Sequence, residues 1–318
     1  MALIRDLAAQ AAEMALVVGA APLVTGFLRK CKARLTRRRG ASVLQPYRDL
    51  LRLLRKDVVL AENASWLFRA APYLVFAATW VAAALVPTFG GGLLFSWSAD
   101  LIAIVAMLGS ARFFLALAGM DVGTAFGGIG ASREMMIGSL AEPAMLMIIF
   151  SLALLAGSTQ LSVIAAFMQS PAVGLRVTLG LALAALLIVA IAESGRIPVD
   201  NPATHLELTM VHEAMVLEYS GRHLALLELA SWVKLLLYLS LIACVFVPWG
   251  VAPPGSGWLA HLLGAGLYAG KIALACALLA VFEMTIAKMR VFRVPNFLGA
   301  ALMLGFLGAM LLFVSRII

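Results

Sequence analysis

The residues most able to do chemistry in this sequence are charged side chains inside segments that are otherwise apolar. Arg112, Glu142 and Lys271 each lie roughly nine to eleven residues into such a segment, hence roughly 14–16 Å deep if the segments are membrane-spanning helices. An ionisable side chain at that depth costs about 2.5–3.5 kcal/mol even on the lenient insertion scale. Several of them in one chain therefore require a reason.

Further charges lie nearer the ends of these segments, at Glu13, Glu193, Glu228, Lys234 and Glu283. Ion pairs such as Glu142 with Lys271 or with Arg112 would be a structural explanation. Buried pairs add little net stability, however, because desolvation cancels most of the attraction. Burial also brings the proton affinities of carboxylates and amines closer to each other, so we expect a row of such groups to carry protons.

The composition indicates which elements hold these charges. Of the 318 residues, 63% are hydrophobic and 13% are charged, and the mean hydropathy is +1.02. Soluble proteins are roughly 45–50% apolar and about 25% charged, so these values exclude a disordered chain, a disulfide-stapled secreted module and an ordinary cytosolic enzyme.

Eight apolar stretches are long enough to cross a bilayer: residues 7–28, 70–88, 101–120, 134–157, 173–193, 230–249, 262–283 and 296–315. Backbone amides find no water inside the hydrocarbon, so each stretch should be helical. We therefore expect an all-α integral membrane protein with about eight transmembrane helices, organised as a single polytopic domain over residues 1–318.

The basic residues are distributed unevenly along the chain. Of the 24 Lys and Arg residues, twelve lie between Arg29 and Arg69, and six more lie on alternate later connections. Cytoplasmic loops carry such an excess, so we expect both termini to face outward and the first apolar segment to be retained as a span. The same distribution makes nucleic-acid binding the weaker explanation for the net charge of +8.

Two connections on the predicted cytoplasmic side, residues 29–69 and 194–229, are too long to be simple turns, and we expect both to be docking surfaces. In the first, leucines alternate with basic residues between Arg48 and Lys56. This pattern predicts an amphipathic helix in the membrane interface, held either by anionic lipid or by a partner protein.

The sequence predicts no metal site in this chain. Cys31, Cys244 and Cys276 are far apart and form no CxxC pair, so the chain alone cannot ligate an iron–sulfur cluster or a [NiFe] centre. His205 and His212 would lie about 10.5 Å apart on one helix, too far for a single ion. A tight turn is predicted by four glycines, at Gly123, Gly127, Gly128 and Gly130.

Two segments resemble the respiratory complex I subunit 1 family. Residues 193–221, ESGRIPVDNPATHLELTMVHEAMVLEYSG, are similar to that family's loop between the fifth and sixth helices, E-x-x-R-x-P-F-D-x-P-E-A-E-x-E-L followed by E-Y-S-G. Residues 45–57, QPYRDLLRLLRKD, are similar to its Q-P-x-x-D-x-x-K-L-x-x-K-E after the first helix. The eight-span plan also agrees, so the resemblance covers nearly the whole chain.

Departures from the family's pattern point to one branch. Val199 stands in place of the Phe before the Asp, and Ala203 and His205 replace the first two carboxylates of the acidic cluster. Together with GIGASRE at residues 128–134, these features resemble the membrane subunit of complex-I-related [NiFe] hydrogenases, a group that includes formate hydrogenlyase, hydrogenase-4 and energy-converting hydrogenases.

The resemblance implies a non-redox membrane subunit of an oxidoreductase complex, with no catalytic centre of its own, in the cytoplasmic (inner) membrane. The [NiFe] centre and the iron–sulfur clusters would lie in hydrogenase large and small partner subunits. The residues expected to dock this peripheral arm are Arg37, Arg38, Gln45, Arg48, Asp49, Arg196, His205 and His212.

Redox turnover in that arm would rearrange charge along this chain and pass the change toward antiporter-like membrane subunits. The residues expected to couple the two events are Arg112, Glu142, Glu193, Asp200, Glu207, Glu213, Glu218, Glu228, Lys234, Lys271 and Glu283.

Two other functions remain open from the sequence. The nearer one is subunit 1 of a quinone-reducing complex I, in which the loop 196–218 would line a quinone tunnel. The more distant one is a self-sufficient secondary transporter, which would usually show two related halves. The two long cytoplasmic loops differ in charge and pattern, so no convincing internal repeat is present.

Overall fold

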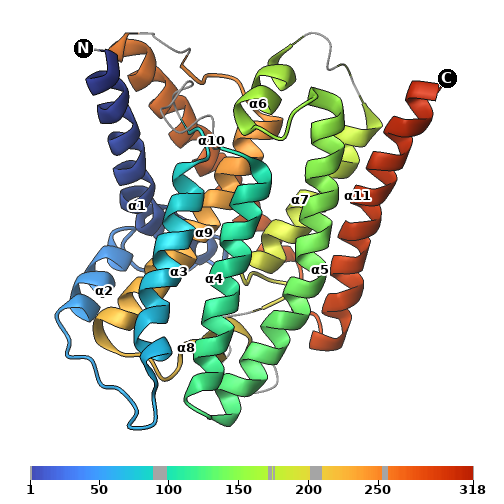
Figure 1. Cartoon of the computed structure of the whole chain (residues 1–318). Coiled ribbons are helices and arrows are strands. Elements are labelled where there is room, and N and C mark those ends of the chain that lie inside the picture. Colours follow the sequence, from blue (N-terminus) through green and yellow to red (C-terminus); the bar gives the residue numbers. More distant parts are fainter. Residues whose placement is uncertain are drawn as a thin grey trace.

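The computed structural model describes residues 2–88, 99–170, 174, 176–200, 210–252 and 257–317, and its regular elements are all helices (Figure 1). In chain order they are α1 (Ala2–Leu35), α2 (Gln45–Leu54), α3 (Trp66–Ala84), α4 (Leu101–Asp121), α5 (Ala125–Ala156), α6 (Leu161–Gln169), α7 (Val177–Glu193), α8 (His212–Val216), α9 (Gly221–Phe246), α10 (Trp258–Thr285), the 3-10 turn η2 (Val291–Arg293) and α11 (Val294–Ile317).

Seven of the described helices are long and apolar enough to cross a membrane, namely α1, α3, α4, α5, α9, α10 and α11. The helix α7 is apolar as well but shorter, at 17 residues. The expectation of an all-α, multi-pass membrane protein is confirmed, and the seven long helices together with α7 account for the eight expected spans.

The helices pack as a bundle around α9 (Figure 1). This helix packs against α1, α2, α3, α6, α7 and α10. Within α9, 78% of an 18-residue apolar stretch is buried. α1 and α10 pack together at one edge of the bundle, and α11 packs on α5 and α7 at the other. Both chain ends lie at the same end of the bundle, and α2 and α8 lie toward the opposite end. Which end faces the cytoplasm stays a prediction from the charge distribution.

Capping residues fix where several helices begin and end. Ser65, Asp100 and Thr124 each place a side-chain oxygen on a free amide of the first turn of α3, α4 and α5. Gly123 makes the turn from α4 to α5, and Gly157 ends α5, both with φ of +74°. These caps set the register of α4 and α5, which carry much of the site described below.

The predicted glycine-rich turn is wrong for all but its first residue. Gly127, Gly128 and Gly130 belong to α5, which begins at Ala125 rather than near residue 134. A Cβ atom on Gly127 would lie 1.9 Å from the backbone oxygen of Gly119, and one on Gly130 would lie 2.9 Å from the Cβ atom of Ala214. These two glycines therefore let α5 pack closely against α4 and α8, a role that local spacing does not reveal.

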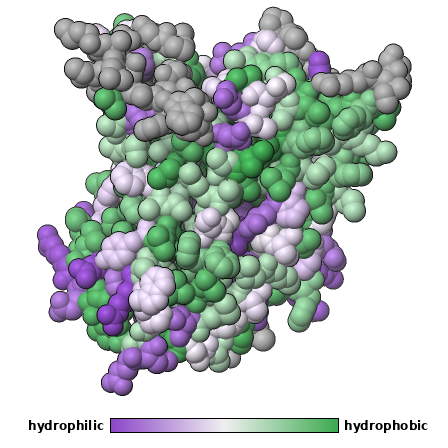
Figure 2. All heavy atoms as spheres, in the orientation of Figure 1, coloured by the Kyte–Doolittle hydropathy of each residue, from purple (hydrophilic) through white to green (hydrophobic). Residues whose placement is uncertain are grey.

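The amphipathic helix expected after the first span is present as α2. Pro46 is buried, α2 packs on α1 and α9, and the Tyr47 hydroxyl donates to the backbone oxygen of Gly19. Leu51 and Leu54 stay exposed beside basic side chains. Figure 2 shows hydrophilic side chains gathered over α2 and at the neighbouring end of the bundle, with hydrophobic side chains over much of the remaining face.

Candidate functional site

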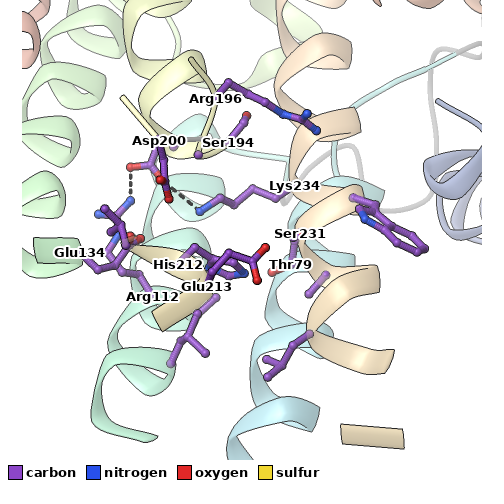
Figure 3. A pocket seen from close by; sticks show the side chains of 18 of the residues that line it. Thr79, Arg112, Glu134, Ser194, Arg196, Asp200, His212, Glu213, Ser231 and Lys234 are labelled. Atoms are coloured by element: carbon purple, nitrogen blue, oxygen red, sulfur yellow. Dashed lines mark hydrogen bonds and ion pairs between the residues drawn. The ribbon is translucent and has the colours of Figure 1, made fainter. Parts of the chain in front are cut away.

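A cavity of about 350 Å³ lies among α1, α3, α4, α5, α9 and the loop that follows α7. Val75, Leu108, Leu115 and Ile137 give part of its wall an apolar character. Its charged lining, among the described residues, consists of Arg29, Lys32, Arg112, Arg196, His212, Lys234, Glu134, Glu193, Asp200, Glu213 and Glu228. Figure 3 shows Arg112 and Glu134 on one side of this cavity and Lys234 reaching toward them from α9.

The guanidinium group of Arg112 pairs with three carboxylates, which come from two helices. The side chain of Arg112, on α4, is only 3% exposed. Its Nη1 atom donates to Glu142 at 2.8 Å, its Nε atom lies 3.3 Å from Glu134, and its Nη2 atom donates to Glu193. Glu134 and Glu142 lie eight residues apart on α5, which is close to two helical turns and places them on one face.

Glu193 also has a second cationic partner. Its other oxygen lies 3.4 Å from the Nζ atom of Lys234, so each carboxylate oxygen of Glu193 faces a cation. Arg112, Lys234, Glu134, Glu142 and Glu193 form the group named here the Arg112 cluster. With every member ionised, two cations face three carboxylates, which leaves one negative charge in excess. The cluster can therefore accept one proton and become electrically balanced.

Two glycines make room for these charges. A Cβ atom on Gly138 would lie 2.5 Å from the Nη1 atom of Arg112, and one on Gly109 would lie 3.1 Å from Glu142 Oε1. Gly138 lies four residues from both Glu134 and Glu142, so it shares their face of α5. The guanidinium group occupies the space that a side chain at position 138 would fill.

Glu142 connects the cluster to the outside of the bundle. Its side chain is 44% exposed, whereas those of Arg112 and Glu193 are 3% exposed. It lines a groove of about 410 Å³ on the outer faces of α4 and α5, whose other walls include Phe113 and Leu146. Arg112 lines both this groove and the inner cavity. Figure 2 shows hydrophilic side chains in the middle of the otherwise hydrophobic surface over α4 and α5.

The end of α10 holds the loop that follows Glu193. Glu283 pairs with Lys32 of α1 and lies 3.9 Å from Arg196. Beyond α10, the backbone amide of Met289 donates to the oxygen of Pro198 at 2.9 Å, and Lys288 lies 3.4 Å from Asp200. Burial lowers the pKa of the Arg196 guanidinium, and the nearby Glu283 carboxylate opposes that shift. These contacts tie α1 and α10 to the loop at the mouth of the cavity.

A second group of carboxyls lies where α8 meets α9. Glu213 and His212 of α8 line the cavity together with Glu228 of α9, and the charges of Glu213 and His212 both act on Glu228. Tyr219 holds this region in place, because its ring stacks on Phe68 at 3.9 Å and its hydroxyl donates to the Phe68 backbone oxygen. Burial raises the pKa of the Tyr219 hydroxyl, so this side chain stays protonated in the physiological range.

The structure leaves other expected coupling residues apart from the cluster. Lys271 donates to the backbone oxygens of Val247 and Trp249, which follow the C-terminal end of α9. It does not pair with Glu142. Glu218 is exposed and does not line the cavity. Glu207 and His205 lie outside the described residues.

The expected docking residues fall on two surfaces. Arg37 and Arg38 are exposed after α1, and Arg48 is exposed on α2. Asp49 accepts from Gln45 at 3.1 Å and pairs with Arg52 at 3.2 Å. Arg196 and His212 line the cavity instead of the outer surface.

Glu134 is the main participant that the sequence reasoning missed. The spacing of eight residues from Glu142 was a usable signal, but the expected span began at residue 134, which placed this carboxylate at a membrane edge. In the structure α5 begins at Ala125, so Glu134 lies well inside the helix. Lys32 and Lys288 were also missed, because they were read only as members of basic runs.

The described residues contain no group of three or more His, Cys, Asp and Glu side chains placed to hold a metal ion. The cysteines Cys31, Cys244 and Cys276 form no disulfide. What the site offers is charge and exchangeable protons.

The chain resembles a known protein family and named relatives. A family model described as NADH dehydrogenase matches residues 9–314. Formate hydrogenlyase subunit 4 of Escherichia coli (strain K12) is 35% identical over 296 residues, which cover 93% of this chain and 94% of that one. Hydrogenase-4 component C of the same organism is 35% identical over 243 residues, which cover 76% and 75%.

A solved structure shares the fold. The membrane-bound sulfane sulfur reductase, an archaeal respiratory membrane complex, contains a chain that superposes with a TM-score of 0.82 at 21% identity, covering 98% of this chain and 99% of that one. At that level of identity the likeness concerns the fold alone.

Proposed function

The chain belongs to the NADH dehydrogenase family, and from this premise we propose that it is the membrane subunit of a complex-I-like [NiFe] hydrogenase of the formate hydrogenlyase type. In this role it anchors the peripheral redox arm and couples electron transfer to translocation of protons or sodium ions. It lies in the cytoplasmic (inner) membrane as one polytopic domain, and the [NiFe] centre and iron–sulfur clusters belong to partner subunits.

The two relatives reported above support the hydrogenase branch. Both are named as components of formate hydrogenlyase or hydrogenase-4, and one of them matches along nearly the full length of both chains. A match over 93% of this chain and 94% of that relative supports a shared position in the complex as well as a shared fold.

The Arg112 cluster is the observation that carries the coupling role. Five charged groups from α4, α5, α7 and α9 meet where removing them from water is costly. Buried ion pairs add little net stability, so a role in ion coupling explains these charges better than a role in stability does. The cluster has one carboxylate in excess, and one of its carboxylates is reachable from the outer groove. A change in charge on the cavity side can therefore alter how readily Glu142 holds a proton.

Coupling starts at the loop after α7. Glu193 directly precedes this loop, and the contacts of Arg196 and Asp200 with the α10 end fix its path. When the redox arm changes charge beside the loop, the ion pairs of Glu193 with Arg112 and with Lys234 change in strength. Arg112 then binds Glu142 more tightly or less tightly, and Glu142 releases or takes up a proton toward an antiporter-like subunit beside α4 and α5.

Docking of the peripheral arm uses the two long connections, residues 29–69 and 194–229. The exposed basic side chains of Arg37, Arg38 and Arg48 offer a positive surface. His212 and Arg196 lie in the cavity mouth, where they would sense the bound arm.

The decisive experiment compares Glu142→Gln and Glu193→Gln with Glu62→Gln in the intact complex, purified in mild detergent. Glu62 is exposed and lies outside the cavity, so it controls for loss of a carboxylate elsewhere. We expect nickel and iron to copurify with all three variants and H₂-dependent dye reduction to persist. Ion uptake into proteoliposomes should be lost in the two cluster variants alone.

Unchanged ion uptake in both cluster variants would overturn the coupling role. Absence of nickel from the wild-type complex would overturn the hydrogenase assignment, and the two outcomes are independent.

The cavity gives specific support to one second function, quinone binding. Its volume of about 350 Å³ and its partly apolar wall fall within the range of small-molecule sites, about 300–1,000 Å³. A quinone-competitive inhibitor that blocks the purified complex, and loses potency when Leu115→Trp narrows the cavity, would favour a quinone-reducing complex.

A further inference from the structure

Glu13 is a second buried carboxyl, remote from the Arg112 cluster. It lies on α1 and is 0% exposed. Its Oε1 atom accepts hydrogen bonds from the backbone amide and the hydroxyl of Thr88, both at 2.7 Å. Among the described residues, its Oε2 atom has no hydrogen-bond partner and no cation forms an ion pair with it. One oxygen is therefore satisfied and the other is not.

The neighbouring Gln10 also has a buried acceptor oxygen that lacks a hydrogen-bond donor in the described part of the chain. It is 3% exposed and lies three residues before Glu13, a spacing that places both on one face of α1. Its amide nitrogen donates to the backbone oxygen of Ala84 at 3.4 Å, and its amide oxygen has no partner among the described residues. Turning the amide around would set its oxygen against the Ala84 oxygen, so a flip does not remove the shortage.

Two buried acceptors on one helix face thus lack a donor between them. An ionised carboxylate in such a place has no counter-charge, and the two donors to Oε1 offset only part of its desolvation cost. A proton on Oε2 removes the negative charge and gives this face of α1 a hydroxyl donor, which is what the Gln10 oxygen three residues away lacks. We propose that Glu13 and Gln10 form a cation-binding site in the half of the bundle nearer the chain termini, and that its occupant is a proton carried on Glu13 Oε2.

The other groups around Glu13 are mainly neutral donors. Tyr268 of α10 and Cys244 of α9 lie within electrostatic range of Glu13, and the Tyr268 hydroxyl shares a 2.6 Å hydrogen bond with Ser240. Lys271 also acts on Cys244, but its ammonium group is bound to the backbone oxygens at the end of α9. The nearby cation is thus held by carbonyl groups rather than by Glu13.

The site is separated from the Arg112 cluster along α9. Lys234 belongs to the cluster, and Cys244, which is within electrostatic range of Glu13, lies ten residues further along α9, roughly 15 Å at about 1.5 Å per residue. Tyr238, between them, is buried and feels the charges of Glu193 and Arg112. The bundle therefore holds protonatable groups at two depths, and proton binding at Glu13 does not depend on the proposed coupling role.

Infrared difference spectroscopy on the intact purified complex tests the proposal. At neutral pH we expect a C=O band of a protonated carboxyl that shifts in heavy water, is absent in Glu13→Gln, and persists in Glu62→Gln and in Glu142→Gln. A wild-type minus Glu13→Gln spectrum that contains only ionised-carboxylate bands would overturn the proposal. So would a protonated band that appears only when sodium is removed, because that result assigns the site to a sodium ion.

A second variant keeps the test decisive if Glu13→Gln does not assemble. Gln10→Leu removes the acceptor and retains the acid, so the band should remain and move to the frequency of a less strongly hydrogen-bonded carboxyl. A band that does not move in Gln10→Leu would contradict the proposed proton position. Loss of ion uptake in Glu142→Gln, measured separately, reports on the coupling role and leaves this result unaffected.

Discussion

The Arg112 cluster and the Glu13 site both hold carboxyls deep inside the bundle, yet these carboxyls are satisfied by different means. In the cluster, cations from α4 and α9 lie within ion-pair distance of three carboxylates. At the Glu13 site, the donors to Glu13 are the amide and hydroxyl of Thr88, and no described cation pairs with it. One environment favours ionised groups and the other favours a neutral acid.

This contrast allows one bundle to respond to charge at one depth and to hold a proton at another. Ion pairs with unequal partners rearrange when a neighbouring charge changes, because each carboxylate competes for the same guanidinium. A carboxyl surrounded by neutral donors keeps its proton until a stronger base reaches it. Four substitutions test this contrast, in order of decreasing effect.

Arg112→Leu should have the largest effect. It removes the cation shared by Glu134, Glu142 and Glu193 and leaves only Lys234 nearby. Breaking a buried ion pair on one side costs about 3–5 kcal/mol. Thermal unfolding of the detergent-solubilised protein should show a large loss of stability, much greater than that of Glu13→Gln. Equal losses in the two variants would remove the distinction between the two sites.

Glu283→Gln tests whether charge pairing extends to the cavity mouth. Glu283 is 1% exposed and faces Lys32 and Arg196, so the variant leaves two cations without their anion. Removing one partner of a buried ion pair is strongly destabilising, but Lys32 is partly exposed and Arg196 is 3.9 Å away, so we expect a smaller loss of stability than in Arg112→Leu. The exposed Glu62→Gln is the matched control, and a loss no larger than the control's would exclude a pairing role for Glu283.

Gly138→Ala should disturb the cluster without altering any charge. The added Cβ atom would lie 2.5 Å from the Nη1 atom of Arg112, and overpacking of this kind costs about 1–3 kcal/mol. Gly128→Ala on the same helix is the control, since no atom lies within 4 Å of its Cβ position. Ion uptake should fall in Gly138→Ala alone, and full uptake in both variants would show that the position of Arg112 is not critical.

Thr88→Val should have the smallest effect. It removes the hydroxyl donor to Glu13 but retains the backbone amide donor, so we expect a loss of about 1 kcal/mol. A loss as large as that of Arg112→Leu would mean that Glu13 is ionised and depends on every donor it has. Thermal unfolding of Thr88→Val and Arg112→Leu in the same detergent measures the two losses of stability.

Hydropathy and charge predicted much of this fold correctly. The apolar stretches became seven long helices and α7, and the amphipathic stretch after the first span became α2. The deep positions of Arg112 and Glu142 also identified two members of the cluster. These features follow from composition within one segment, so no knowledge of neighbouring segments is needed.

The partners of these residues did not follow from the sequence. Both Arg112 and Lys271 were candidates for Glu142, and the tertiary contacts select Arg112 while Lys271 caps α9. Glu134 was assigned to a membrane edge because hydropathy does not mark where α5 begins. Gly127 allows close contact of α5 with α4, and Gly138 leaves room for the Arg112 side chain. The spacing of glycines along the chain does not distinguish such packing glycines from glycines in a turn.

Hydropathy and helix rise are properties of each segment alone, so the amino-acid sequence is enough to predict that the chain crosses the membrane as helices and that charges are buried among them. The packed helices were needed to learn which charges meet, which carboxyl opens to the outer groove and which one is left without a described cation. Those outcomes depend on how far each helix is rotated and shifted against its neighbours, and packing between segments distant in sequence sets that rotation.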